Sequence, residues 1–293
     1  MRKPDFFILG AAKCGTTSLW YYLSQHPEIY MCRPKEPGFF VRGKKTVSEP
    51  ADYFSLFDAA GDRRLAGDAT TGYFSCAETP GLIRLLCPDA KFIVTVRHPA
   101  DRAYSLYHFM RSVGFEFAST FEEALDLESS RVSDQRFQQD WPIYLGACLY
   151  FRSGLFGEQA DRYLGLMERR RFYFLTLDRL KREPVAVLRE IFAFLGVAAD
   201  FIPPDLSRKY TSLFTSRNAP LHHWWRRHIW KNLPRAREYW PLTALHRLEW
   251  KYNIRSIPPI NAETRRKLCD DYRQDLGLFS RLTGLQVDPD GRW

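Results

Sequence analysis

The feature that most constrains this chain is the stretch from Phe6 to Leu19, which reads FFILGAAKCGTTSL. An apolar run typical of a buried strand leads into a turn bounded by Gly10 and Gly15, and three hydroxyl residues follow at positions 16–18. The first N–H groups of a helix are unpaired and attract anions, and glycines let a phosphate approach them closely. The stretch therefore predicts a strand, an anion-binding turn and a helix in direct succession.

The turn resembles an ATP-binding P-loop but differs from it in the position of its lysine. The P-loop has the form G-x-x-x-x-G-K-[ST], and this chain has Thr16 where that lysine belongs, with Lys13 inside the turn instead. Asp68 in LAGDATTGY is the nearest candidate for a magnesium-holding aspartate, and the stretch before it is only weakly apolar. We therefore expect the turn to hold phosphate without a metal ion. The alternative is a chance glycine turn before a core helix, which the lysine and the three hydroxyl residues disfavour.

The pattern of apolar runs predicts an α/β fold. Strand patterns at 5–10 and 92–96 are each followed by a helix pattern, and a further strand is predicted within RRRFYFLTLDRL, at 169–180. A helix at 184–195 is closed by Gly196, and Asn261 is a plausible cap for a last helix. Repeated strand–helix units predict three layers, with a central parallel sheet and helices on both faces. We expect one domain over residues 1–293.

Composition narrows the class of partner. The net charge is +9 and the pI is near 9.3, so we expect anionic partners: a nucleic acid, a polyanionic nucleotide or an acidic glycan. We find no run of 18 apolar residues, and the short apolar stretch near the N-terminus reads as a strand, not a signal peptide. The six cysteines form no C-x-x-C pair and predict ordinary thiols of a reducing compartment.

Two motifs resemble those of sulfotransferases that use 3′-phosphoadenosine 5′-phosphosulfate (PAPS). AAKCGTTSL resembles the family's 5′-phosphosulfate loop, and IVTVRHPADRAYSLYHFM resembles its 3′-phosphate motif, with Arg97 at a strand end and Ser105 on the next helix. An arginine fork and a hydroxyl suit one dianionic phosphate. The resemblance implies the P-loop NTPase-like sulfotransferase fold, PAPS as donor, adenosine 3′,5′-bisphosphate (PAP) as product, and no metal. The donor contacts that it implies are Lys13, Cys14, Gly15, Thr16, Thr17, Ser18, Arg97, Ser105 and Arg217.

A third motif carries the expected base. RPKEPGFF resembles the Lys-Glu-x-x-Phe-Phe signature of the Golgi heparan-type and bacterial branch, which implies that Glu36 takes the proton from the acceptor hydroxyl or amine. Lys13 is the second implied catalytic residue, because it would stabilise charge on the departing 5′-phosphate. His26 and His108 are not expected to act as bases, since the Thr-His-Leu-Pro setting of the cytosolic branch is absent. The plain alternative for Glu36 is a surface carboxylate paired with Lys35.

Several positions depart from the family pattern. Gly38 replaces a histidine, and Ala69 in GDATTGYF replaces a lysine that serves the acceptor end of the site in the glycan branch. Asp68 is a second-choice acid–base or acceptor-binding residue, or else a buried carboxylate that ties down the following turn. Tyr150 matches the family's Gly-x-Tyr helix, and the adenine-stacking residue stays unidentified.

A basic, aromatic and proline-punctuated segment at about 206–241 predicts a lid or insert. Its run HHWWRRHIW fits an acceptor wall, an interfacial membrane patch or a packed lid without special chemistry. The resemblance to sulfotransferases implies sulfuryl transfer to a carbohydrate, a glycolipid, or another small-molecule or lipid alcohol. The competing functions are a P-loop nucleotide kinase or NTPase and, in a different class, a basic nucleic-acid-binding protein.

The expected partners and cellular location depend on which of these functions the chain has. We expect no nucleic-acid partner if the enzyme reading holds, and peripheral membrane contact would come through the Trp/Arg-rich lid. The predicted location is cytoplasmic, at the membrane periphery if the lid binds lipid, or in the Golgi lumen if an N-terminal anchor has been removed.

Overall fold

The structure is a computed structural model of the 293-residue chain. It describes residues 1–41, 46–134, 148–207, 214–216, 218, 224 and 254–288. The predicted lid at 206–241 and the predicted phosphate contact Arg217 fall almost entirely outside these ranges, so both stay predictions, as does the extent of the single domain.

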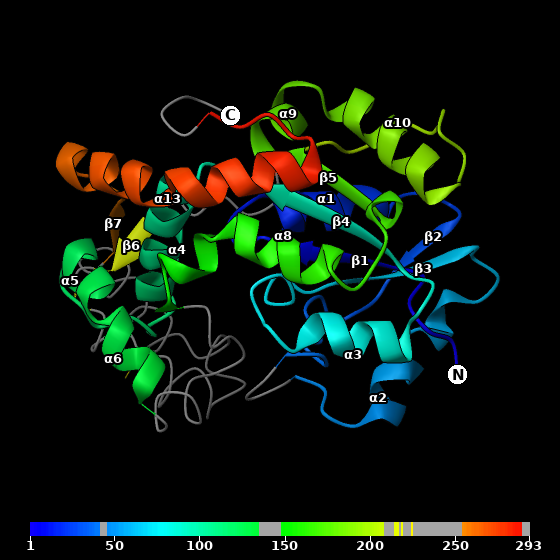
Figure 1. Cartoon of the computed structure of the whole chain (residues 1–293). Coiled ribbons are helices and arrows are strands. Elements are labelled where there is room, and N and C mark those ends of the chain that lie inside the picture. Colours follow the sequence, from blue (N-terminus) through cyan, green and yellow to red (C-terminus); the bar gives the residue numbers. More distant parts are fainter. Residues whose placement is uncertain are drawn as a thin grey trace.

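A five-stranded parallel sheet forms the centre of the molecule (Figure 1), in the order β2-β3-β1-β4-β5. The chain builds one side of β1 first and then crosses to the other side, so a topological switch point lies between β1 and β4. In α/β sheets, ligands bind beyond the carboxyl ends of the strands at such a point. The strands are β1 (Phe6–Gly10), β2 (Ile29–Met31), β3 (Leu65–Ala69), β4 (Lys91–Val96) and β5 (Phe172–Thr176).

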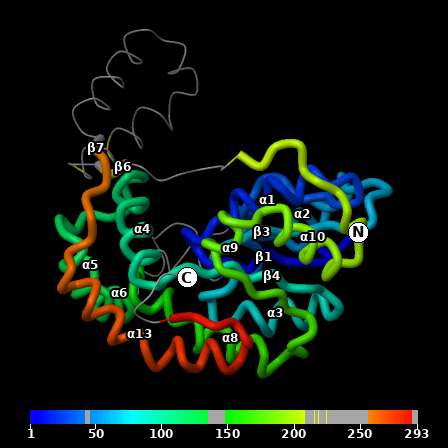
Figure 2. The backbone as a smooth tube through the Cα atoms, turned by 90° about the horizontal axis from the view of Figure 1, so that it is seen from above, coloured from blue at the N-terminus to red at the C-terminus, as the bar shows by residue number. Residues whose placement is uncertain are grey.

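Helices cover both faces of this sheet, which confirms the predicted three layers (Figure 2). Alternate residues of β1 explain why: Phe6 and Ile8 pack into one core cluster, and Phe7 and Leu9 pack into the other. On the first face lie α1 (Thr16–Leu23), α9 (Leu177–Arg182) and α10 (Pro184–Leu195). On the second lie α3 (Thr79–Leu86), α4 (Pro99–Ser112), α8 (Phe156–Leu164) and α13 (Ala262–Thr283).

The remaining described elements are short and lie around this centre. They are α2 (Pro50–Ser55), α5 (Phe121–Asp126), α6 (Glu128–Ser133), the 3-10 turns η1 (Asp58–Ala60), η3 (Arg152–Gly154) and η4 (Arg169–Arg171), and an antiparallel pair, β6 (Phe214–Ser216) with β7 (Ile254–Ser256). Of the helices in the described ranges, none is long and apolar enough to cross a membrane.

Most predicted elements are confirmed, with one informative difference. Gly196 ends α10 at a φ of 88°, and the Asn261 side chain caps α13 by accepting from two backbone N–H groups. The strand predicted within 169–180 is β5, and α9 begins directly after it, where the Thr176 side chain caps the helix by accepting from Arg179 N at 3.2 Å. Strands β2 and β3 were not predicted from the sequence.

Candidate active site

One cavity of about 800 Å³ opens beyond the carboxyl ends of the strands. It brings together residues that follow all five strands of the sheet, including Lys13 after β1, Glu36 after β2 and Arg97 after β4. A volume of several hundred Å³ is typical of small-molecule sites. The predicted site residues among its lining are Lys13, Gly15, Thr16, Thr17, Ser18, Glu36, Arg97 and Ser105. The three predicted motifs therefore meet in one place.

The start of α1 has the form expected of an anion site. Gly15 is the N-cap residue at a φ of 85°, and it makes no side-chain cap. The positive φ favours glycine here, and a Cβ would also lie 2.5 Å from Cδ1 of Leu177, so that this side chain would have to shift. The first turn of α1 contains no acidic side chain. Its N–H groups and the hydroxyls of Thr16 and Thr17 thus lie at the cavity wall with positive helix-end potential.

Lys13 reaches the cavity from inside the turn. Its Nζ lies 4.2 Å from the centroid of the Phe109 ring, in cation–π geometry. Burial and, second, the nearby Arg97 guanidinium lower the pKa of Lys13 from 10.5 to about 8. The side chain therefore still carries its charge at neutral pH, and it would gain interaction energy from an anion.

Glu36 contributes to the cavity wall from the segment after β2. Its carboxylate forms an ion pair with Lys35 Nζ at 2.5 Å and accepts a long hydrogen bond from Thr71 Oγ1 at 3.4 Å. The pairing with Lys35 that the alternative interpretation named is thus present, but it lies in the cavity wall, where both side chains are only partly exposed. A partly exposed carboxylate in a cavity can accept a proton from a bound hydroxyl.

Arg97 and Ser105 are available for a ligand. Arg97 directly follows β4, and Ser105 lies on α4. Within the described part of the chain, neither side chain has a hydrogen-bond or ion-pair partner, and both line the cavity. A guanidinium fork and a hydroxyl without protein partners match the predicted phosphate contact.

The Cys14 side chain points into the core, unlike Lys13 and Gly15, which line the cavity. Its thiol is fully buried, is not among the described cavity-lining groups, and donates to Ala12 O at 3.6 Å. Its carbonyl accepts from Thr95 Oγ1 at 2.9 Å, which ties the turn to β4. Burial raises the pKa of Cys14 to about 11, so the thiol stays neutral. Its side chain serves the packing of the turn.

Asp68 is buried beneath the cavity. It is 0% exposed, is not among the described lining residues, and accepts hydrogen bonds from Tyr53, Thr70 and Tyr73. Burial raises the pKa of Asp68 to about 6, although the three hydrogen bonds act in the opposite direction. Of the two interpretations from the sequence, this geometry favours the structural carboxylate.

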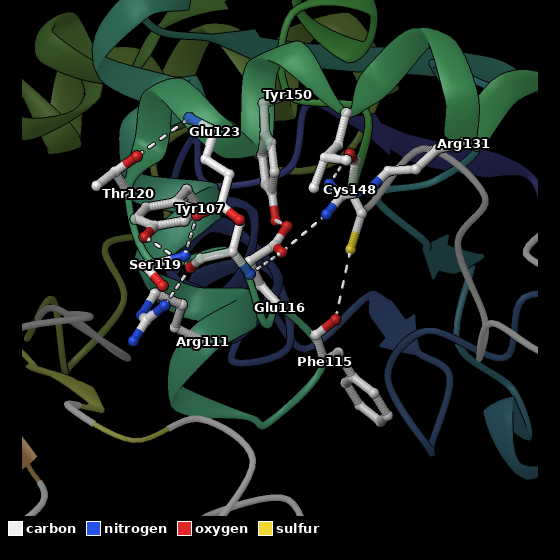
Figure 3. Close-up of polar contacts among 12 residues, drawn as sticks. Tyr107, Arg111, Phe115, Glu116, Ser119, Thr120, Glu123, Arg131, Cys148 and Tyr150 are labelled. Carbon is white, nitrogen blue, oxygen red and sulfur yellow. Dashed lines mark hydrogen bonds and ion pairs between the residues drawn. The ribbon is translucent and has the colours of Figure 1, made fainter.

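Three further residues that the sequence motifs drew attention to also lie in the core. The His108 ring packs against the rings of Tyr104 and Tyr107, and the His26 Nε2 lies 3.0 Å from Ala198 O. Neither histidine is part of the described cavity lining. The Tyr150 hydroxyl donates to the buried Glu116 at 2.6 Å, and Arg131 pairs with the same carboxylate at 2.8 Å (Figure 3).

Sequence reasoning missed part of the cavity wall. Arg102 lies three residues before Ser105 on α4, so helical spacing alone could have found it. Ser153 and Gln159 come from a distant part of the chain, and we see no sequence signal for them. An apolar section of the wall contains Tyr22, Leu177, Leu180, Pro184 and Leu206.

The cavity is electropositive. The basic side chains in its described lining are Lys13, Lys35, Arg97, Arg102 and Lys181, and the acidic one is Glu36. Such a wall concentrates anionic ligands. Over the described residues, no group of three or more His, Cys, Asp or Glu side chains is placed to hold a metal ion.

Comparisons with known proteins agree with this geometry. The family model described as the sulfotransferase domain matches residues 3–223. Human heparan sulfate glucosamine 3-O-sulfotransferase 6 is 30% identical over 196 residues, which are 67% of this chain and 53% of that protein. The human bifunctional heparan sulfate N-deacetylase/N-sulfotransferase 3 is 28% identical over 207 residues, 67% of this chain and 22% of that protein. The chain thus spans about half of the first relative and less of the second.

A solved structure extends the likeness to nearly the whole chain. The sulfotransferase from Alicyclobacillus acidocaldarius superposes with a TM-score of 0.73 at 27% identity, covering 98% of both chains. This agreement confirms the predicted fold and disfavours the kinase, NTPase and nucleic-acid-binding alternatives. With a family model that matches most of its length, the chain belongs to the sulfotransferase domain family.

Proposed function

We propose that this chain transfers a sulfuryl group from PAPS to a hydroxyl or amine of an acceptor, with Glu36 as the general base. The observation that carries the proposal is the content of one cavity: a helix start without a side-chain cap beside Lys13, then Arg97 and Ser105 without side-chain partners among the described residues, and Glu36 as the one carboxylate of the described lining. The family membership of the chain supports the same reaction.

The residues present fit the donor at both of its phosphates. Lys13 and the backbone N–H groups of residues 15–17 would hold the 5′-phosphate, and Arg97 with Ser105 would hold the 3′-phosphate. The apolar wall section that includes Leu177 and Pro184 offers a surface for a purine base. When bound, PAPS supplies an activated sulfuryl group. Two separate phosphate contacts would select this nucleotide over ATP.

The protein's own contribution is then positioning, charge stabilisation and proton transfer. Sulfuryl transfer should follow the logic of phosphoryl transfer, in which charge spreads towards the leaving group. Lys13 and the helix-start amides would stabilise that charge. Glu36 would remove the proton of the attacking hydroxyl, a step that contributes about 10²- to 10⁴-fold in rate.

We propose a carbohydrate as the acceptor class. Both relatives are named for heparan sulfate, one as a glucosamine 3-O-sulfotransferase and the other as an N-sulfotransferase, which supports a sugar hydroxyl or amine here. Gly38 and Ala69 mark the acceptor end of the site as different from the pattern expected of the glycan branch. Glycolipids and other alcohols therefore belong in any acceptor test. The cytoplasmic location and a membrane contact through the lid stay predictions.

The direct test is a labelling reaction with the pure protein. PAPS carrying sulfur-35 is mixed, in EDTA, with desulfated heparin, chitosan oligosaccharides, a glycolipid or a simple alcohol. We expect label in at least one acceptor, and a loss of about 10²- to 10⁴-fold in rate with Glu36→Gln. Turnover of ATP with magnesium and no transfer of label would contradict the proposal and support a kinase or NTPase.

A further inference from the structure

We propose that Asp68 is a positioning residue that holds Glu36 in its place through a layer of hydroxyl groups. This inference rests on the proposed role of Glu36 as the general base. Asp68 itself lies below the cavity wall, so it would act only through the segment 36–40.

The lower half of the arrangement is a carboxylate saturated with hydroxyl donors. Tyr53 OH donates to Oδ2 of Asp68 at 2.8 Å, and Tyr73 OH donates to the same oxygen at 2.9 Å. Thr70 Oγ1 donates to Oδ1 at 2.8 Å. Asp68 and Tyr73 are both fully buried, so water cannot replace these bonds. Each hydroxyl has one proton, and the carboxylate fixes where that proton points.

The upper half connects two of those hydroxyls to the Glu36 segment. Gly38 N donates to Thr70 Oγ1 at 3.4 Å, and Phe40 N donates to Tyr73 OH at 3.5 Å. The hydroxyl lone pairs can accept from these amides because the hydroxyl protons are directed to Asp68. In addition, Glu36 N donates to the β3 carbonyl of Ala69 at 3.2 Å. Ala69 at the end of β3, together with Thr70 and Tyr73 after it, thus holds the segment at three amides.

The Glu36 segment needs such support because its backbone is strained. Glu36 has a φ of 63°, which costs a non-glycine residue free energy and persists only where the surroundings enforce it. Gly38 is also left-handed, with a φ of 70°. A segment with two left-handed residues would relax if its amides lost their acceptors. Relaxation would move the Glu36 carboxylate away from the acceptor hydroxyl.

Asp68→Asn keeps the shape of the side chain and removes its capacity to accept three hydroxyl protons. An amide has one acceptor oxygen and an NH₂ group that donates, so at least one hydroxyl must reverse. A reversed Thr70 or Tyr73 hydroxyl points its proton at the amide of Gly38 or Phe40 and repels it. Tyr53→Phe is the matched control, since Tyr53 bonds to Asp68 and makes no described hydrogen bond to residues 36–40.

The test combines turnover, hydrogen exchange and PAP binding. With the best acceptor of the labelling panel, we expect Asp68→Asn to lower kcat by about 10- to 100-fold, as for a misplaced catalytic group. In the same variant we expect the amides of residues 36–40 to exchange hydrogen faster and the Kd of PAP to change less than about twofold. Tyr53→Phe should change both kcat and the exchange rates much less than Asp68→Asn does. Because Asp68 acts through Glu36, Glu36→Gln with Asp68→Asn should be no slower than Glu36→Gln alone.

Additive losses in the double variant, or unchanged exchange in segment 36–40, would overturn the inference. If Glu36→Gln keeps wild-type turnover, Glu36 is not the base and both proposals fail. If Glu36→Gln is slow while Asp68→Asn is not, only the role of Asp68 fails. Should Asp68→Asn not fold, Thr70→Val and Tyr73→Phe each cut one link and carry the same test against Tyr53→Phe.

Discussion

At the scale of single residues, backbone strain occurs at the two residues proposed to be catalytic. In the described part of the chain, Lys13 and Glu36 are the two non-glycine residues with positive φ, at 67° and 63°. Each such residue costs about 1–3 kcal/mol, which a fold accepts where the conformation serves a site. Their identification from motifs as catalytic candidates and their strained backbones are independent observations, and both select the same pair.

The lowered pKa of Lys13 predicts that the affinity for PAP depends on pH. Its pKa is lowered to about 8, so its positive charge is largely present at pH 7 and lost as the pH rises to 9. We expect the affinity for PAP, measured by calorimetry, to fall over this range. Lys13→Met should weaken binding about 10- to 100-fold at pH 7 and flatten the pH profile, since a charge-assisted bond to phosphate is lost.

Lys13→Arg is the control for this pH dependence, because a guanidinium stays charged at pH 9. The other charged or titratable groups that act on Lys13 are Arg97, Cys14, Glu36 and Lys35. The stability of the fold changes with pH in the opposite direction to the affinity for PAP. Because Lys13 binds its proton more strongly in the unfolded chain, its contribution to the free energy of unfolding increases as the pH rises from about 8 to 10.5. A pH-independent Kd in the wild-type protein would refute this role of Lys13.

Arg97 leads to a prediction about nucleotide selectivity. Arg97→Ala should raise the Kd of PAP about 10- to 100-fold, because a bidentate arginine–phosphate contact is lost. The Kd of 5′-AMP, which has no 3′-phosphate, should change little. Calorimetry with both nucleotides checks this, and equal losses for the two would show that Arg97 does not contact the 3′-phosphate.

At the scale of elements, close contact between α8 and α13 depends on a glycine. Asp275 accepts from the N–H groups of Gly157 and Glu158 at 2.8 and 2.9 Å, and a Cβ on Gly157 would lie 2.3 Å from the Asp275 carbonyl oxygen. Because backbone atoms cannot move aside cheaply, we expect Gly157→Ala to lower the free energy of unfolding by about 1–3 kcal/mol or more.

Gly81 on α3 supplies the control. It also lies in the first turn of a helix, is exposed, and has open space where a Cβ would be. Gly81→Ala should therefore leave stability unchanged or raise it by up to about 1 kcal/mol, because alanine favours helix. Urea unfolding of both variants checks the contrast, and equal effects would contradict the packing argument.

Elements with strong local signals could be predicted from the sequence, and those defined by distant contacts could not. β1 is an apolar run before a glycine turn, and the caps of α10 and α13 are single residues with a clear signature. β3 reads LAGDA, with two poor strand formers, and becomes a strand because β1 and β2 pair with it on either side.

The same division applies to the site. Lys13, Glu36 and Arg97 belong to motifs and could be located from the sequence. Ser153 and Gln159 reach the cavity only through the packing of α8 and η3, which no local pattern encodes. The network beneath Glu36 likewise depends on Tyr53, whose approach to Asp68 is a tertiary contact.

At the scale of the whole molecule, donor binding should stabilise the fold. The cavity joins groups that follow β1, β2 and β4 with groups on α4, so a nucleotide held there links segments that would separate on unfolding. With PAP at 100 times its Kd, the gain is about 2.7 kcal/mol, or roughly 5–10 °C in Tm. Differential scanning fluorimetry in EDTA checks this, and an unchanged Tm at saturating PAP would contradict it.

The turn before α1 and the end of β4 are proposed to bind two phosphates of a single nucleotide, and the proposed function depends most on this contact. A crystal structure of the protein grown with PAP tests it directly. We predict the 5′-phosphate at the start of α1 beside Lys13, and the 3′-phosphate between Arg97 and Ser105. A cavity filled by side chains, or PAP bound elsewhere on the molecule, would contradict the claim.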